Sequence, residues 1–361
     1  METIPKVMSG VHLTGYGGPE KLVYREDIPV PVPRAGEVLI KVKGAGVNNT
    51  DINTRLGWYS KKVTSDTNAN GIEGLSEVDN NDASWDGIPL KFPRIQGGDI
   101  CGIIVQVGEG VEQDRIDTRT IVRSMQNNPT SNNPLEMQTM GSEFDGGFAQ
   151  YCVAKAKESF PINCDWSDIE LASIPISYST AEGMLCRADV EKETILITGA
   201  SGGVGSAAIQ LAKIRGATII AQCSPDKASF LKDLGADQTV NRSDNLVKVL
   251  GKNSVDVVFD LVGGSSWPQL LDIIKPGGKY VTSGAIAGPI VDLDLRSLYL
   301  KDLTLYGSTV NDPFVFENVI RYIEEGQIKP LVAQSFPLKE IHKAQKVFME
   351  KKFIGKIVLI P

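Results

Sequence analysis

The chain has 361 residues, of which 42% are hydrophobic and 22% charged, the balance of a globular protein with room for two domains. Its 37 Lys and Arg residues against 44 Asp and Glu residues give a formal net charge of −7. With no basic cluster to offset it, this charge argues against a nucleic-acid partner and against an anionic membrane surface. Five cysteines lie scattered without CxxC spacing, and no apolar stretch reaches about 18 residues. We therefore expect a cytoplasmic protein without a membrane segment.

The first third of the chain is predicted to be rich in β-strands, because short runs of strand-forming residues alternate with Gly and Pro. The expected strands are 12–18, 21–27, 37–47, 103–107 and 148–154. Two polar segments, Ser60–Phe92 and Met125–Ser142, fit neither strand nor helix periodicity. Loops of this length are usually mobile or functional. The first could form a lid or a wall of a substrate pocket, or it could cover a subunit surface.

From about Glu193 the pattern changes to short apolar strands that alternate with helices, which predicts a parallel sheet covered on both faces. The first helix shows apolar residues at the spacing of one helical face: Val204, Ala207, Ala208, Leu211 and Ala212. The expected strands are 193–199, 217–223, 237–241, 255–262, 278–285 and 303–309. After helices at Phe314–Glu325 and Glu340–Lys351, the chain closes with a strand at 355–361 that is expected to rejoin the first domain.

The strongest local signal is a glycine-rich turn between the first of these strands and the first helix. A tight strand-to-helix turn needs residues that tolerate positive φ, and a pyrophosphate at a helix N-terminus needs unobstructed backbone N–H groups. The alternative is a glycine-rich turn without a ligand. The βαβ context favours a dinucleotide site. The expected coenzyme-binding residues of this turn are Gly199, Ser201, Gly202, Gly203, Val204 and Gly205.

The choice between NAD and NADP depends on the end of the second strand, where NAD enzymes carry an Asp or Glu for the ribose hydroxyl. Here the strand ends at Cys223-Ser224 without a carboxylate, and Lys227 and Arg242 are placed to reach a 2′-phosphate. Asp226 is the counter-argument, although Ser224-Pro225-Asp226 also has the pattern of a helix start. We therefore expect NADP(H), bound in part by Ser224, Lys227 and Arg242.

Taken together, several motifs resemble the medium-chain dehydrogenase/reductase superfamily, in its zinc-free quinone oxidoreductase and enoyl reductase-like branch. These motifs are GYGGPEKL, AGVNNTDIN, FPRIQGGDICGIIVQVGEGV, FDGGFAQYCV, TGASGGVGSAAIQLAK, LGAD, FDLVGG and GKIVL. The resemblance implies an α/β fold with a Rossmann doubly wound parallel-sheet domain at 161–310. It also implies a β-rich GroES-like catalytic domain made of 1–160 and 311–361. Relatives of this type form homodimers through the last strand of the coenzyme domain, and Leu303–Thr309 suits that role.

In the zinc-containing relatives, the resemblance places metal ligands at three positions that hold Asn48, Gly98 and Ile176 here. The four closely spaced cysteines of the structural zinc lobe are also missing, and the two histidines, His12 and His342, lie elsewhere. Asp99, next to Gly98, is the one conceivable ligand at these positions, and zinc usually takes three or four N, S or O ligands, which this set does not supply. We therefore expect no metal.

Without a Lewis acid, hydride addition to a conjugated carbonyl compound needs hydrogen-bond donors for the developing enolate. The resemblance to enoyl reductases indicates Tyr59 as the proton donor, since a tyrosine stays protonated at neutral pH. Tyr59 could instead simply pack against the substrate or a loop. Asn48 is expected to orient the nicotinamide ribose or to bind the substrate oxygen, with a purely structural turn asparagine as the alternative.

Further coenzyme contacts are expected where parallel strands end, because ligands of open α/β sheets bind there. These are Val262, Gly263, Ser283, Gly284 and Ala285, although glycines here could also be simple turn residues. The resemblance adds Thr180 as a residue that packs on the nicotinamide, with a helix N-cap as the other reading. Asp51 is expected to brace its loop rather than act as a base.

The sequence thus predicts an NADPH-dependent, zinc-independent oxidoreductase that reduces a small-molecule quinone, enone or other conjugated carbonyl compound. An enoyl-CoA or acyl-thioester reductase is one alternative. A coenzyme-binding protein with little turnover is another, since a shared fold does not prove a shared activity.

Overall fold

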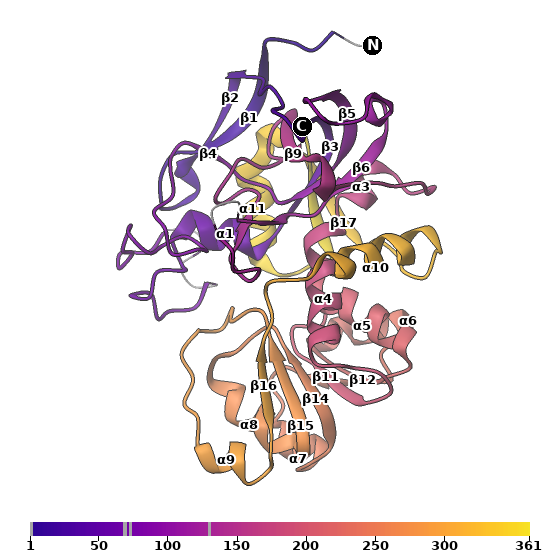
Figure 1. Ribbon diagram of the computed structural model, residues 1–361. Helices are drawn as coiled ribbons and strands as arrows, with labels where there is room; N and C mark the ends of the chain where they lie inside the picture. Colours follow the sequence, from indigo (N-terminus) through magenta and orange to yellow (C-terminus); the bar gives the residue numbers. More distant parts are fainter. Residues whose placement is uncertain (1–2, 68–70, 72–73, 129–130) are drawn as a thin grey trace.

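The computed structural model describes residues 3–67, 71, 74–128 and 131–361, which form two lobes, each built on its own main sheet (Figure 1). The strands of the upper lobe are β1 (Val7–Leu13), β2 (Leu22–Pro29), β3 (Glu37–Val47), β4 (Arg94–Ile95), β5 (Asp99–Val107), β6 (Arg119–Val122), β9 (Tyr151–Lys155), β10 (Ser159–Pro161), β17 (Val332–Pro337) and β18 (Lys356–Ile360). Its main sheet has the order β10-β6-β5-β3-β18-β17, with β9 paired to β3, and a smaller sheet has the order β2-β1-β4. This is the predicted β-rich lobe.

The lower lobe holds a parallel sheet whose order is that of a doubly wound dinucleotide-binding domain. Its strands are β11 (Thr194–Ile197), β12 (Thr218–Cys223), β13 (Gln238–Asn241), β14 (Val255–Asp260), β15 (Ile274–Thr282) and β16 (Thr304–Gly307). Its helices are α4 (Pro175–Arg187), α5 (Gly203–Arg215), α6 (Ala228–Leu234), α7 (Leu246–Leu250), α8 (Trp267–Ile273) and α9 (Leu295–Tyr299). The order β13-β12-β11-β14-β15-β16 reverses between β11 and β14, and ligands bind beyond the strand ends at such a switch point. The predicted fold class is confirmed.

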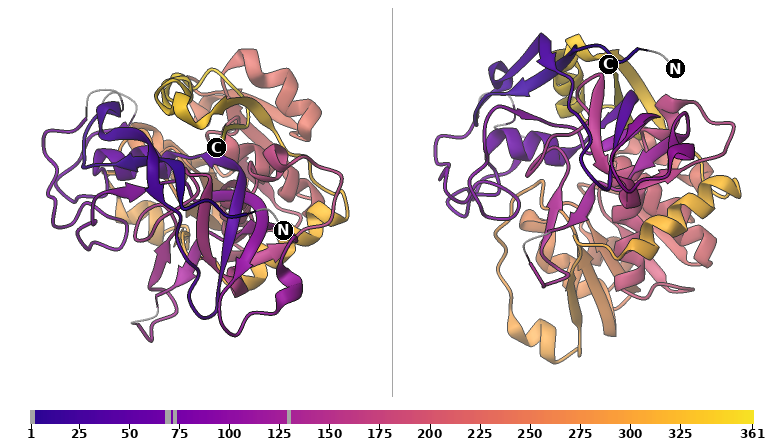
Figure 2. Two further views of the ribbon diagram at one scale, coloured as in Figure 1. Left: turned by 90° about the horizontal axis from the view of Figure 1, so that it is seen from above. Right: turned by 45° about the horizontal axis from the view of Figure 1, so that its top comes forward.

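The C-terminal segment returns to the first lobe through α10 (Pro313–Glu324) and α11 (Ile341–Glu350). The yellow end of the chain lies among the indigo N-terminal strands in both views of Figure 2. β18 pairs antiparallel with β3, with Ile357 opposite Val47, and parallel with β17. This register brings Lys356, the first residue of β18, beside the end of β3.

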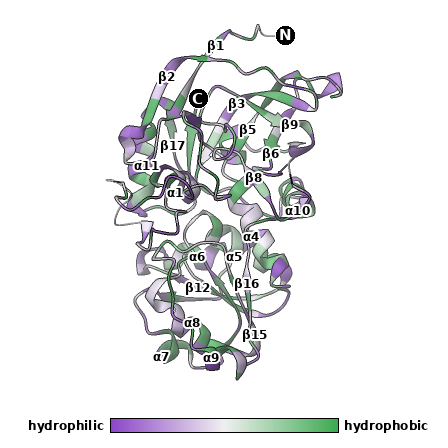
Figure 3. Ribbon diagram, turned by 60° about the vertical axis from the view of Figure 1, so that its left-hand side comes forward, coloured by the Kyte–Doolittle hydropathy of each residue, from purple (hydrophilic) through white to green (hydrophobic). Residues whose placement is uncertain are grey.

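The main hydrophobic cluster of the lower lobe extends to Cys101 and Ile121 of the upper sheet, and a second cluster fills the upper lobe. Figure 3 shows hydrophobic residues along the strands of both sheets. Phe259 and Phe148, each fully buried, belong to the lower and upper clusters respectively. Phe316 and Val319 of α10 join the same cluster as α4 and α5, although the predicted boundary assigns α10 to the catalytic domain. That boundary stays a prediction.

Local structure differs from the prediction at four places. Residues 49–56 form helix α1 (Asn49–Leu56), and α3 (Asp168–Leu171) precedes α4. Met125–Ser142 was expected to be irregular but contains a hairpin of β7 (Met125–Asn127) and β8 (Met137–Thr139), whose short polar strands give little periodicity. The first strand runs from Val7 to Leu13 rather than over 12–18, because the glycine-rich residues that follow form a turn. None of the described helices is long and apolar enough to cross a membrane.

The glycine-rich turn supplies a stability test with a matched control. A Cβ added to Gly205 would lie 2.4 Å from the carbonyl oxygen of Gly199 and 2.6 Å from Ala200 Cα, which are backbone atoms that cannot move aside. At Gly202 the nearest atom would be 3.5 Å away, an ordinary contact, and its φ of −76° suits any residue. We expect Gly205→Ala to lower the free energy of unfolding by about 1–3 kcal/mol and Gly202→Ala to change it little. Denaturant titration measures both, and equal losses would contradict this account of the turn.

Candidate active site

The glycine-rich turn joins β11 to α5 at the switch point of the parallel sheet. Gly199 has a φ of +58°, the left-handed region that favours glycine, and Gly202 is the N-cap of α5. Val204 packs partly against the core, and a Cβ added at Gly202 would meet only the Gly199 carbonyl oxygen, at a contact distance of 3.5 Å. The N-terminus of the 13-residue α5 therefore presents N–H groups beside a glycine that leaves room for a ligand, an arrangement that fits a pyrophosphate.

A C-terminal segment lies against this turn. The Gly355 amide donates to the Ser201 carbonyl oxygen at 3.2 Å. Lys227 is buried, and its ammonium donates to the carbonyl oxygens of Lys351 and Phe353 at 2.8 and 2.9 Å and to Ser201 Oγ at 3.4 Å. In this arrangement Lys227 ties the two lobes together rather than lying free for a phosphate, and its coenzyme role stays a prediction.

The other two residues expected to recognise the coenzyme, Ser224 and Arg242, directly follow β12 and β13 respectively. Arg242 is exposed, and its amide donates to the Cys223 carbonyl oxygen at 3.1 Å, which places it next to the end of β12. A hydrogen bond with Ser224 lowers the pKa of the exposed Asp226 carboxyl. A cation and a carboxylate thus stand near the same strand end.

Strand ends beyond the switch point are held by one buried carboxylate, Asp260, which sequence reasoning missed. Its oxygens accept from the amides of Val262 and Gly263 at 2.9 and 3.1 Å and from Tyr280 Oη at 2.6 Å. The Ala287 amide donates to the Val262 carbonyl oxygen at 2.9 Å, which joins the loops after β14 and β15. The sequence signal for Asp260 was an Asp at the end of an apolar strand.

The residues expected near the nicotinamide come from these loops and from α4. Ser283, Gly284 and Ala285 directly follow β15, which ends at Thr282 and not at residue 285 as predicted, and their coenzyme contacts stay a prediction. Thr180 lies inside α4, whose first residue is Pro175, so Thr180 is not a helix N-cap. Its place against the nicotinamide stays a prediction.

Asn48, Gly98 and Ile176, which the resemblance predicts to stand at the positions of zinc ligands, converge at one point between the lobes. Asn48 Nδ2 donates to Asp99 Oδ2 at 2.8 Å, and the Ile176 amide donates to Asp99 Oδ1 at 2.5 Å. A Cβ at Gly98 would lie 2.7 Å from Ile176 Cδ1. No group of three or more His, Cys, Asp or Glu side chains suited to a metal occurs within the described ranges.

Lys356, which sequence reasoning also missed, occupies the centre of this cluster. Its ammonium donates to Asn48 Oδ1 at 2.5 Å and to Asp99 Oδ2 at 2.7 Å, and both Lys356 and Asp99 are buried. The nearby Asp51 carboxylate accepts a hydrogen bond from the Asn48 backbone N–H at 2.7 Å, so it braces the start of α1 as expected. Burial raises the pKa of Asp51 to about 7. Lys356 belongs to the GKIVL motif, but only the register of β18 shows what it faces.

Tyr59 lies just beyond α1, under part of the 60–92 segment. Its hydroxyl is 3.0 Å from Thr50 Oγ1, and its ring stacks on Trp85 with centroids 6.2 Å apart. Burial raises the pKa of Tyr59, so the phenol is protonated at neutral pH. The Thr67 amide donates to the Ile286 carbonyl oxygen of the lower lobe at 3.4 Å. The described part of this segment thus contacts both lobes.

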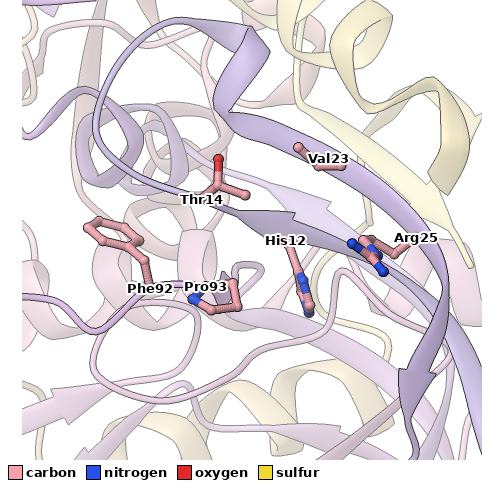
Figure 4. A pocket seen from close by; sticks show the side chains of 6 residues that line it. All are labelled: His12, Thr14, Val23, Arg25, Phe92 and Pro93. Carbon is pink, nitrogen blue, oxygen red and sulfur yellow. The ribbon is translucent and has the colours of Figure 1, made fainter.

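A separate groove of about 300 Å³ lies on the outer hairpin of β1 and β2 (Figure 4). It is lined by His12, Thr14, Val23, Arg25, Phe92 and Pro93. Burial and the Arg25 charge lower the pKa of His12. None of the residues predicted for the active site lines this groove.

Comparison with known proteins gives two family matches and full-length relatives. The alcohol dehydrogenase GroES-like domain matches residues 34–163, and the zinc-binding dehydrogenase family matches residues 203–325. The crystal structure of a putative alcohol dehydrogenase from Sinorhizobium meliloti is 45% identical, with a TM-score of 0.88, over 99% of this chain and 98% of that one. Human quinone oxidoreductase is 26% identical over 100% of both chains. The acryloyl-coenzyme A reductase of Metallosphaera sedula is 26% identical over 92% of this chain and 95% of that protein.

These matches cover both lobes, and they agree with the doubly wound sheet and its glycine-rich turn. The chain therefore belongs to the medium-chain dehydrogenase/reductase superfamily, in its quinone oxidoreductase-like branch, and is an oxidoreductase with a nicotinamide coenzyme site.

Proposed function

We propose that this protein is an NADPH-dependent, zinc-independent oxidoreductase that reduces a quinone, an enone or another conjugated carbonyl compound. The observation that carries the proposal is the composition of the converged cluster. Asn48, Gly98 and Ile176 offer no ligand set for zinc, and a buried ammonium lies at their centre. The family match named after zinc-binding dehydrogenases covers residues 203–325, which include none of these three positions.

The proposed chemistry needs charge stabilisation and proton delivery rather than a Lewis acid. A bound reduced nicotinamide supplies a hydride. The N-terminus of α5 holds the pyrophosphate, and the loops after β14 and β15 border the nicotinamide. Tyr59 gives a proton to the reduced substrate, and Trp85 shields that hydroxyl from bulk water.

NADPH is favoured over NADH because β12 ends at Cys223-Ser224 without a carboxylate. Arg242 is the exposed cation beside that end, while Lys227 already holds the C-terminal segment. Asp226 opposes this preference, because its hydrogen bond with Ser224 lowers the pKa of that exposed carboxyl and keeps it ionised. The five cysteines, all free, support the prediction of a reducing cytoplasmic compartment.

A screen of NADPH and NADH oxidation against quinones, enones and acyl-thioesters, with and without a chelator, tests the function and its alternatives. We expect turnover of quinones or enones with NADPH that the chelator leaves unchanged. Exclusive turnover of acyl-thioesters would favour the enoyl-CoA reductase reading, which the acryloyl-coenzyme A reductase relative keeps open. Tight NADPH binding without any turnover would favour a binding protein.

Arg242→Ala tests the coenzyme assignment. Loss of a charged phosphate contact should raise the Kd of NADPH at least about tenfold and leave that of NADH unchanged. Lys232→Ala, an exposed cation on α6, is the matched control. Equal losses for both coenzymes, or tighter binding of NADH by the wild type, would overturn the assignment.

Tyr59→Phe tests the proton donor, because it removes the hydroxyl and keeps the ring on Trp85. We expect kcat to fall about tenfold or more, with the Kd of NADPH and the melting temperature nearly unchanged. A kcat equal to that of the wild type would remove Tyr59 from the mechanism.

We also propose a homodimer that forms through the edge strand β16. The segment that precedes β16 carries several exposed apolar side chains, among them Ile290, Leu295, Tyr299 and Leu300. An apolar patch beside an open sheet edge is a typical pairing surface.

Sedimentation equilibrium should give twice the chain mass, and Leu300→Asp should shift the protein toward monomer. Val32→Asp is the matched control, because Val32 is 72% exposed and Leu300 69%. A monomeric wild type at micromolar concentration would contradict the dimer.

A further inference from the structure

The side chain of Lys356 spans the distance between the coenzyme turn and the converged cluster. A Cβ at Gly203, the first residue of α5, would lie 2.7 Å from Lys356 Cδ, so the lysine stem packs on the helix N-terminus. The ammonium then reaches Asn48 and Asp99 on the other lobe. One side chain thus touches the expected pyrophosphate site and the expected substrate site.

The hydrogen bonds at this cluster show which group still has a donor to offer. Both polar atoms of the Asn48 side-chain amide already have partners, because Oδ1 accepts a hydrogen bond from Lys356 and Nδ2 donates one to Asp99. An ammonium carries three N–H bonds. Two are donated to Asn48 and Asp99, and across the described parts of the chain the third meets no acceptor. The uncommitted donor therefore belongs to the lysine rather than to the asparagine.

We propose that the Lys356 ammonium is the positive charge of this active site and that its third N–H binds the carbonyl oxygen of the substrate. This inference rests on the proposed function and names the group that activates its substrate. Asp99 has no exposed surface, so it needs the ammonium as its counter-charge, and the pair stays fixed while the substrate reacts. In this proposal Asn48 does not bind the substrate oxygen, and it instead positions the Lys356 ammonium.

The step balances as follows for an enone. Hydride from the reduced nicotinamide forms a C–H bond at the β-carbon, and the π electrons of the C=C bond move toward the carbonyl oxygen. The resulting enolate oxygen accepts a hydrogen bond from Lys356, which keeps its proton. Tyr59 then protonates the α-carbon and regains a proton from water. The substrate gains two electrons and the nicotinamide loses them. A preorganised donor of this kind typically contributes about 10²–10³ in kcat.

Three variants test the proposal in the full-length protein. Lys356→Ala should lower kcat for enones about 100-fold, and added ethylammonium should restore at least a tenth of the lost activity. Tetramethylammonium, which has a charge but no N–H, should not restore it. Lys352→Ala, an exposed neighbour, is the matched control. The double variant Lys356→Met with Asp99→Asn removes both charges together, so it keeps a neutral core if loss of the lysine alone prevents folding.

A second readout does not depend on turnover. The anion of para-nitrophenol resembles an enolate, because its negative charge is delocalised from the oxygen, and this anion absorbs visible light. With NADP⁺ present, wild-type protein should bind the phenolate form and lower the pKa of the bound phenol, whereas either Lys356 variant should not. Unchanged kcat in a folded Lys356 variant, or equal phenolate binding by wild type and variants, would overturn the proposal. A wild type that binds phenolate through Lys356 but reduces no conjugated carbonyl would overturn the proposed function alone.

Discussion

The buried ion pair of Lys356 with Asp99 is the constraint on which the rest of the site depends. Asp99 begins β5, Lys356 begins β18, and β3 lies between them and ends beside Asn48. The pair therefore joins three neighbouring strands at one end of the sheet. Its second carboxylate oxygen reaches the Ile176 amide of α4, so the same pair also fixes the lower lobe. Removing either partner leaves an uncompensated charge in the interior, which is strongly unfavourable.

This pair also decides how much positive charge the site contains. The buried cation of the described cluster is the Lys356 ammonium, and its charge is already shared with one carboxylate. A singly charged hydrogen-bond donor suits a developing enolate, which spreads its charge over several atoms. Oxidation of a simple alcohol relies more heavily on a Lewis acid. The proposed substrate class follows from this difference.

The lower lobe is ordered by a second buried carboxylate. Asp260 gathers amides from the turn after β14 and the hydroxyl of Tyr280 from β15. The loops at the switch point are thereby held at their roots, where a coenzyme needs a rigid surface. On the opposite side, the segment with Trp85 and Thr67 contacts Tyr59 and the Ile286 backbone. The loops after β14 and β15 are thus positioned by sheet geometry, and the Tyr59 side chain by contacts with the insertion.

The sequence by itself determined the parallel sheet, the glycine-rich turn and the return of the last strand, because each leaves a local pattern of apolar residues or glycines. Through the resemblance it also predicted that zinc ligands are missing at Asn48, Gly98 and Ile176, and that stays a prediction. It did not reveal that Lys356 pairs with Asp99 or that Asp260 accepts a hydrogen bond from Tyr280. The sequence of a strand does not show which residue a charged side chain will face. Strand register and the packing of α4 on the sheet decided those contacts. Tertiary structure alone brought residues 48, 99, 176 and 356 together, since the energy of a buried charge depends on neighbours that lie far away in the sequence.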